Sequence, residues 1–267
     1  MNAQKISSFL GKTGAVASLL AASAALTGSL APSASAVTLL PPTNLGINGE
    51  AEINVGLGCL SSNCVAPTDI PLIANIESLV DASSGNKSRL FIDNLLTPTN
   101  YDGGSLGKAI FLKKDAGTNP SGFWFRPSET NANGSVGEEK GQLEVGTYKI
   151  TFASLLSELT IRYFDTESRN STGVPNFGGI LKTDGTLVTG NNPVLPGSNG
   201  NIQYQTWKNV KSITLKLGND IPNGTGDGVD FQLEATQAVP EPTALAGLGL
   251  VAGAMAVSRR RKITKSS

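Results

Sequence analysis

The side chains of this sequence that could carry catalytic chemistry are mainly carboxylates, because its 267 residues include no histidine. Without histidine, the Ser-His and Cys-His nucleophile systems are excluded, and so are the usual zinc ligand sets. The sequence also shows no Ser-x-x-Lys motif at a strand-to-helix turn and no phosphate-binding Gly-x-x-x-x-Gly-Lys-Ser/Thr loop. The residue types therefore disfavour most enzyme classes.

Paired carboxylates could still hydrolyse a glycosidic bond, a reaction that needs two such groups across a cleft. The candidate pairs are Glu138 with Glu139, Asp165 with Glu167, and Asp227 with Asp230. Neighbouring residues of a strand point to opposite faces, so the first pair could not converge within a strand. We interpret all these residues as solvated charges. The sequence thus predicts that the protein is not an enzyme and has no catalytic residues.

A calcium site is the more serious alternative for the acidic residues. The segment NDIPNGTGDGVD offers Asp220, Asp227 and Asp230 among glycines, and Ca²⁺ prefers such oxygen ligands. The segment lacks the Asp-x-[Asp/Asn]-x-[Asp/Asn]-Gly spacing of a calcium loop. Aspartates that form turns explain it equally, because Asp tolerates left-handed backbone and bonds to its own main chain. We therefore predict no cofactor and keep calcium as the weaker alternative.

Aromatic residues could present a binding platform to sugars. Phe123, Trp124 and Phe125 are consecutive and precede Arg126. In a strand, the two phenylalanines face one way and the tryptophan faces the other. Core packing explains these residues, and also Tyr204 and Trp207. A carbohydrate-binding module remains the alternative function.

The elements that must position these residues are strands. Apolar and polar residues alternate in 146–152, 158–164, 211–217 and 228–235, which predicts half-buried strands. Shorter candidates are 51–58, 73–79, 88–93, 108–113, 122–126 and 201–207. About ten short strands with glycine-rich turns predict an all-β fold, namely an antiparallel sandwich of jelly-roll type. We expect a helical turn only at 153–158 and a long loop at about 170–201.

Two cysteines, Cys59 and Cys64, have four residues between them. Half of a metal site is excluded for want of partners, because the chain has no further cysteine and no histidine. In an oxidising compartment such a pair forms a disulfide that fixes a local turn. We therefore predict the Cys59–Cys64 disulfide.

The amino-terminal 36 residues have the pattern of a secretory signal peptide. Lys5 and Lys12 give a basic amino-terminal region, and the Ala-rich apolar run 14–31 follows. Ala34-Ser35-Ala36 then forms a small-residue cleavage site. The alternatives are a short membrane helix or a disordered arm. We predict export, with cleavage by signal peptidase after Ala36.

The charge balance changes once the two ends are set aside. The chain has 21 basic and 21 acidic residues, but seven of the basic ones lie in residues 1–36 and 241–267. Residues 37–240 then hold fourteen basic and twenty acidic residues, a net charge of −6. A domain with this negative net charge repels the phosphates of nucleic acids, so we predict no nucleic-acid partner.

The carboxyl-terminal segment 243–257 is apolar and about 23 Å long as a helix, against a hydrocarbon core of about 30 Å. The basic residues that follow it favour a cytoplasmic carboxyl end and an external main domain. A helix of the protein core would not be followed by clustered cations. A permanent membrane anchor remains the rival interpretation.

The tail combines three parts in order. They are the tripeptide Pro240, Glu241 and Pro242, the apolar segment 243–257, and the basic cluster Arg259, Arg260, Arg261 and Lys262. This arrangement resembles the PEP-CTERM sorting signal. The resemblance implies recognition by an exosortase, a membrane cysteine transpeptidase, and removal of the tail near Pro-Glu-Pro. It also implies a transient membrane tether and delivery to the surface or extracellular polysaccharide matrix of a bacterium.

A second resemblance lies within the main domain. Leu143-Glu144-Val145-Gly146 in GQLEVGTYKITF resembles the signature of the LEVG family of PEP-CTERM proteins. That family implies no known activity and supplies no catalytic residues. We expect Gly146 to break two strands at a bulge or tight turn.

The predicted organisation is a signal peptide (1–36), a β-sandwich surface domain (37–238) and a sorting signal (239–262). The predicted function is that of a non-enzymatic exported protein of the cell surface or extracellular matrix. The alternative is a module that binds exopolysaccharide, with or without calcium.

Overall fold

The computed structural model describes residues 36–39, 50–82, 84–94, 99–111, 119–136, 145–164, 166, 178–188, 197–198, 200–218 and 229–237. All of them belong to Ser35–Ala238, one of two compact units into which the chain divides. The other unit, Met1–Ala34 with Val239–Ser267, lies outside the described residues. No helix among the described residues is long and apolar enough to span a bilayer.

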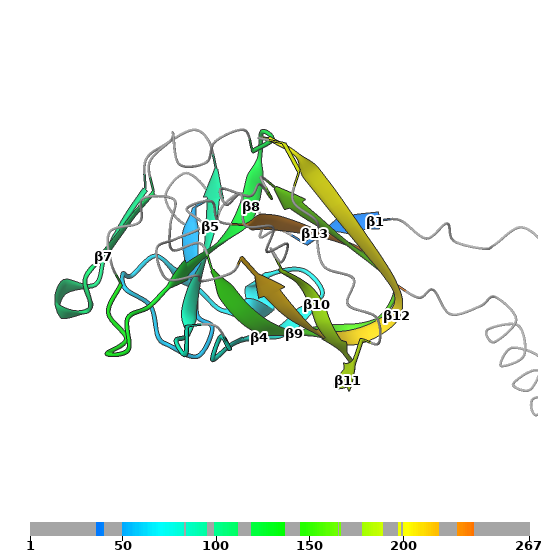
Figure 1. The fold of residues 1–267 in the computed structure, drawn as a ribbon, viewed down its shortest axis with the longest axis horizontal. Helices are drawn as coiled ribbons and strands as arrows, with labels where there is room; N and C mark the ends of the chain where they lie inside the picture. Colours follow the sequence, from blue (N-terminus) through cyan, green and yellow to red (C-terminus); the bar gives the residue numbers. More distant parts are fainter. Residues whose placement is uncertain are drawn as a thin grey trace, which may run out of the picture. The chain divides into compact units, whose positions relative to one another are not determined.

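Strands make up most of the regular structure of the Ser35–Ala238 unit (Figure 1). In chain order they are β1 (Ala36–Thr38), β2 (Ala51–Ile53), β3 (Cys64–Val65), β4 (Ile73–Leu79), β5 (Ser88–Asn94), β6 (Thr99–Asp102), β7 (Lys108–Phe111), β8 (Phe123–Glu129), β9 (Gly146–Phe164), β10 (Gly178–Thr183), β11 (Thr186–Leu187), β12 (Ile202–Leu217) and β13 (Asp230–Gln237). Two 3₁₀ turns, η1 (Pro67–Asp69) and η2 (Gly104–Leu106), complete the list. The predicted all-β class is confirmed.

Eleven strands form one sheet, in the order β11-β10-β12-β9-β13-β8-β5-β2-β3, with β1 paired to β13 and β4 paired to β9. Strands β6 and β7 form a separate hairpin. The large sheet is mixed, because β2 and β3 pair in parallel while its other pairs are antiparallel. The expectation of a purely antiparallel sheet is wrong at this point, since residues 54–63 carry the chain back along the sheet before β3 begins.

The long strands β9 and β12 shape the sheet. They pair with each other along nearly their whole length, with an irregularity between Val210 and Ser212. The other edge of β9 pairs with two strands. Its first half pairs with β4 and its second half pairs with β13. Figure 1 shows β12 turning sharply, so that the two halves of the sheet fold toward each other.

The predicted helical turn at 153–158 is wrong, because these residues continue β9. Inward-facing residues occupy even positions before this segment, such as Tyr148 and Ile150, and odd positions after it, such as Leu159 and Ile161. A bulge absorbs this change of phase while the backbone stays extended. Opposite the bulge, Asn209 in β12 has a φ of 55°. Gly146, predicted to interrupt two strands, is the first residue of β9.

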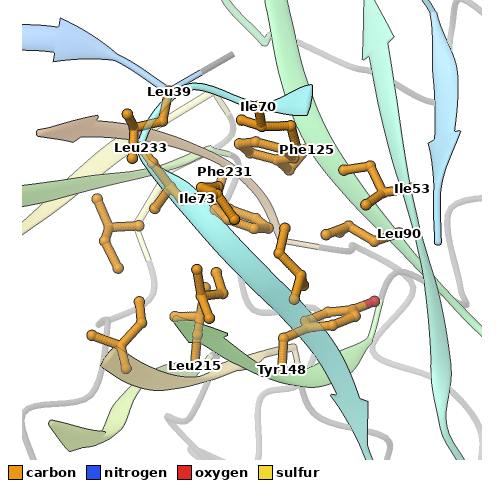
Figure 2. Packing of buried hydrophobic residues seen from close by; sticks show 14 of the residues in the cluster. Leu39, Ile53, Ile70, Ile73, Leu90, Phe125, Tyr148, Leu215, Phe231 and Leu233 are labelled. Atoms are coloured by element: carbon orange, nitrogen blue, oxygen red, sulfur yellow. The ribbon is translucent and has the colours of Figure 1, made fainter. Parts of the chain in front are cut away.

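The main core lies between the two halves of the folded sheet. One cluster joins residues from the first half of β9, such as Tyr148, with residues from its second half, such as Ile161. Figure 2 shows Leu39, Phe231 and Leu215 pointing into this common interior. Burial of each such side chain contributes about 1.5–3 kcal/mol, so this shared interior is what keeps the sheet folded over.

Part of the outer face of the sheet is also covered. Phe91 of β5 packs there with Tyr101 and Phe111 of the β6–β7 hairpin, at ring-centroid distances of 4.6 and 4.9 Å. Leu60 from the loop after β2 belongs to the same buried cluster. We call this region, over β2, β5 and β8, the covered face.

Strand β1 lies beside the last strand of the domain. Ala36 pairs with Thr236, and the Leu39 N–H donates to the Leu233 carbonyl at 2.8 Å. Leu39 is fully buried in the main core, which anchors this end of the chain. The predicted signal-peptide cleavage site after Ala36 falls within β1.

Candidate ligand-binding face

Outward-facing residues of β9, β12 and β13 form a surface that we call the open face. Its members are Glu158, Thr160 and Arg162 of β9, Tyr204, Thr206 and Lys208 of β12, and Gln232, Glu234 and Thr236 of β13. All of them are at least partly exposed except Gln232, which is 6% exposed. Alternate residues of these strands, including Leu159, Ile161 and Leu233, point into the main core. The open face is therefore fixed by the same alternation that builds the core.

The registers of the three strands align these residues in rows. Arg162 lies opposite both Tyr204 and Gln232. Thr160 lies opposite Thr206 and Glu234 in the next row, and Glu158 lies opposite Lys208 and Thr236 in the third. With strands about 4.8 Å apart and about 3.3 Å per residue, this grid measures about 10 by 13 Å.

Arg162 is the centre of the first row. Its guanidinium carbon lies 5.6 Å from the centroid of the Tyr204 ring. The Nη1 atom of Arg162 lies 3.3 Å from Oε1 of Glu234 and donates to Oε1 of Gln232 at 3.5 Å. From β9, the arginine thus bridges an aromatic ring on β12 and a carboxylate and an amide on β13.

Neighbouring polar groups are also held in place. Nε2 of Gln232 donates to the Phe123 carbonyl at 2.6 Å, which fixes the orientation of its amide. The hydroxyls of Thr160 and Thr206 lie 3.0 Å apart and share a hydrogen bond. Because these side chains are already ordered, a ligand would lose little of its binding free energy to ordering them.

Tyr204 gives the open face its apolar component. Its side chain is 56% exposed although it is large and aromatic. An aromatic ring offers apolar contact area with a polar hydroxyl at its tip. Beside it, the arginine and threonine groups supply donors and acceptors in fixed positions. Such a combination can bind a molecule that has both C–H surfaces and hydroxyl groups.

The covered face holds charged residues in a different state. Nη1 of Arg89 donates to Oε1 of Glu52 at 2.7 Å, and their side chains are 3% and 0% exposed. Nη1 of Arg126 lies 2.8 Å from Oδ2 of Asp93, and the guanidinium carbon of Arg126 lies 4.5 Å from the Phe111 ring centroid. These pairs are shielded from solvent, so we assign them a structural role.

Glu52 also connects the sheet to the disulfide loop. Its Oε2 accepts a hydrogen bond from the Leu60 N–H at 2.5 Å, and Arg89 Nη1 donates to the Gly58 carbonyl at 3.0 Å. Burial raises the pKa of Glu52, while the Leu60 N–H and Arg89 act in the opposite direction. The predicted disulfide is confirmed, since Cys59 and Cys64 are bonded with their Cα atoms 5.9 Å apart.

The calcium candidates are only partly described. Asp230 is 3% exposed in β13, and its Oδ2 accepts a hydrogen bond from Asn119 Nδ2 at 2.5 Å. Asp220 and Asp227 lie outside the described residues, as do Glu138, Glu139, Asp165 and Glu167. Within the part of the chain that the structure describes, no group of three or more metal-ligating side chains could hold an ion.

The aromatic strand β8 is packed as the sequence predicts. Trp124 is fully buried against Phe164, and Phe125 stacks on Phe231 with ring centroids 5.0 Å apart. Phe123 packs against the main core from a partly buried position. None of these three rings lies on the open face.

Tyr204 contradicts the prediction of core packing. In residues 201–207 the polar Gln205 faces inward, and its Oε1 accepts hydrogen bonds from the Tyr163 hydroxyl at 2.8 Å and the Ile180 N–H at 3.3 Å. Because Gln205 faces inward, Ile202 and Tyr204 face outward, and Trp207 is partly buried against the core. A satisfied buried amide thus sets the phase of the strand, against its hydrophobic pattern.

Sequence reasoning missed the central residues of the open face, Arg162, Gln232 and Glu234. Each occupies a polar position in a correctly predicted alternating strand. The alternation indicates that these side chains face outward, but only the strand registers bring them together. The buried pairs had a clearer signal in the sequence, because Arg89 and Asp93 directly flank the apolar run Leu90-Phe91-Ile92.

The residues of the predicted processing sites lie mostly outside the described part of the chain. This holds for Ala34 and for Pro240, Glu241, Pro242, Arg259, Arg260 and Arg261. The Leu143-Glu144-Val145-Gly146 motif is described only at Val145 and Gly146. Comparison with known proteins gives no match to a family model, to a curated protein or to a solved structure.

Proposed function

We propose that this chain is a non-enzymatic, exported bacterial protein of the cell surface or extracellular matrix. It is secreted through its amino-terminal signal, cleaved by signal peptidase, and sorted and processed by an exosortase at its carboxyl-terminal signal. The membrane holds it only transiently through residues 243–257. Its resemblance to PEP-CTERM proteins, and to their LEVG family, supports this route.

The order of segments along the chain carries the proposal. A disulfide-containing domain extends from β1 to β13. The amino-terminal signal ends at Ala36, within β1, and the carboxyl-terminal signal begins directly after the domain. A disulfide between Cys59 and Cys64 is compatible with an oxidising compartment. We further propose that the domain is a jelly-roll-like sandwich, supported by the folded sheet and by the sharing of β9 between β4 and β13.

Mapping the carboxyl terminus of the mature protein by mass spectrometry tests the sorting proposal. In a bacterium that has an exosortase, we expect mature protein that ends near Pro240-Glu241-Pro242. Glu241→Ala should abolish this processing, whereas Glu77→Ala, at an exposed position of β4, should leave it unchanged. Mature protein that retains Thr243–Lys262 would instead show a permanent anchor, and normal processing of Glu241→Ala would refute the motif.

A second candidate function is polysaccharide binding, favoured by the open face. The exposed ring of Tyr204 beside the fixed Arg162, Gln232 and Glu234 side chains supports it. This function is compatible with the first, because a matrix protein needs a means of attachment. Calcium dependence is part of this candidate, since Asp220, Asp227 and Asp230 belong to one glycine-containing segment of the sequence.

A further inference from the structure

We infer that the open face binds an uncharged polysaccharide, with Tyr204 as the stacking residue and Arg162 as the central hydrogen-bonding residue. This inference rests on the second candidate function above and specifies its site and ligand class. Three features of the open face support it: its charge balance, its preformed polar pairs and its small apolar content.

The charges of the open face balance. Its two cations, Arg162 and Lys208, face two carboxylates, Glu158 and Glu234. The 3.3 Å contact of Arg162 with Glu234 already compensates the positive charge nearest to Tyr204. Arg162 therefore leaves no uncompensated cation beside Tyr204 to attract the carboxylate of an acidic sugar. Binding of a neutral sugar does not depend on such an attraction.

The polar pairs match the chemistry of sugar hydroxyls. Each hydroxyl both donates and accepts a hydrogen bond, and it therefore suits a site that presents donors and acceptors side by side. Arg162 with Glu234 is one such pair, and the hydroxyls of Thr160 and Thr206 form another. Glu234, Thr160 and Thr206 belong to one row of the grid and Arg162 belongs to the neighbouring row, so a sugar beside Tyr204 can meet both pairs.

The apolar content of the open face is too small for a typical protein interface. The core of such an interface is apolar and has few charged residues. Among the nine residues of the open face, only Tyr204 is a large exposed apolar side chain, and Ile202 at 39% exposure is its nearest apolar neighbour along β12. One aromatic ring among polar groups suits a sugar better than a protein partner.

Affinity gel electrophoresis of the full chain provides the test. The neutral probes embedded in the gels are mixed-linkage β-glucan, xylan, galactomannan and dextran, and the acidic probe is polygalacturonate. We expect retardation by at least one neutral probe, unchanged between low and high salt because no net charge attracts the ligand. Tyr204→Ala should weaken this binding about tenfold, and Tyr204→Phe should retain most of it.

The controls separate the site from the fold. Val80→Ala removes another exposed apolar side chain, 58% exposed and outside the open face, and should bind as the wild type does. Unchanged circular dichroism of Tyr204→Ala would exclude misfolding as the cause of weaker binding. A parallel series with EDTA tests whether calcium contributes.

Each contrary outcome has a distinct meaning. Salt-sensitive binding to polygalacturonate alone would overturn the inference of an uncharged ligand and leave polysaccharide binding standing. Neutral binding that survives Tyr204→Ala would overturn the assignment of the open face. Absence of retardation by every probe would overturn both the inference and the second candidate function.

Discussion

The covered and open faces are two parts of the outer surface of the same sheet, and both contain arginine–carboxylate pairs. On the covered face, Arg89 and Glu52 are 3% and 0% exposed and 2.7 Å apart. On the open face, Arg162 and Glu234 are 36% and 30% exposed and 3.3 Å apart. Burial makes the first pair necessary for the fold, whereas exposure leaves the second accessible to the ligand that we propose. The same residue types thus serve stability in one region and, in our proposal, recognition in the other.

The largest effect should come from breaking one pair in each region. Arg89→Ala leaves the buried Glu52 carboxylate without its cation and should lower the free energy of unfolding by about 3–5 kcal/mol. Arg162→Ala should lower it by about 1 kcal/mol or less, because solvent screens the exposed pair. Urea denaturation of the two variants measures this difference. Equal losses would show that the two pairs do not differ in the way that their burial implies.

The disulfide should have an intermediate effect, confined to the covered face. The double variant Cys59→Ser with Cys64→Ser removes a short closed loop and should lower the free energy of unfolding by about 2 kcal/mol. Reduced wild-type protein provides the matched comparison and should lose a similar amount. Binding of neutral polysaccharide at temperatures below unfolding should be unaffected, since the disulfide loop contacts the covered face. Lost binding in a folded variant would contradict the independence of the two faces.

The smallest effect is expected from the threonine pair of the open face. Replacing Thr160 and Thr206 together with valine preserves shape and suits strands, so stability should change by less than about 0.5 kcal/mol. Loss of the two hydroxyls should weaken polysaccharide binding about threefold, as expected for one hydrogen bond. Thr151→Val with Thr214→Val, on the other half of β9 and β12, is the control; these two threonines lie opposite Ser212 and Lys149. A greater loss of stability than of affinity would assign the threonine pair to the fold.

Much of the fold follows from local alternation, as β4, β5, β7, β8, β9, β12 and β13 show. Long-range geometry does not follow in the same way. The sequence predicts a helical turn at 153–158, between two strands. In the structure the inward positions shift there from even to odd, and a bulge makes this shift within one strand. The change from even to odd apolar positions can be seen in the sequence. The bulge by which the backbone accommodates it cannot.

The open face shows the same limit. In residues 201–207, hydrophobicity favours Ile202 and Tyr204 for the core, yet Gln205 lies inside because Tyr163 and Ile180 donate to it. Those two partners come from β9 and β10, which are distant from Gln205 in the sequence. The phase of the strand, and with it the exposure of Tyr204, depends on contacts that no local pattern contains.

The position of β13 has a mechanical consequence. This strand is the last before the proposed sorting signal, and β9 pairs with it from Asp230 to Gln237 while β1 lies on its other edge. In a protein held at its carboxyl end with polysaccharide on the open face, tension would run along β13. Because the hydrogen bonds of an antiparallel pair are perpendicular to the strands, such a load shears them together instead of opening them one by one. If the proposed function holds, the strand order would let this domain bear force between its carboxyl end and a polysaccharide on the open face.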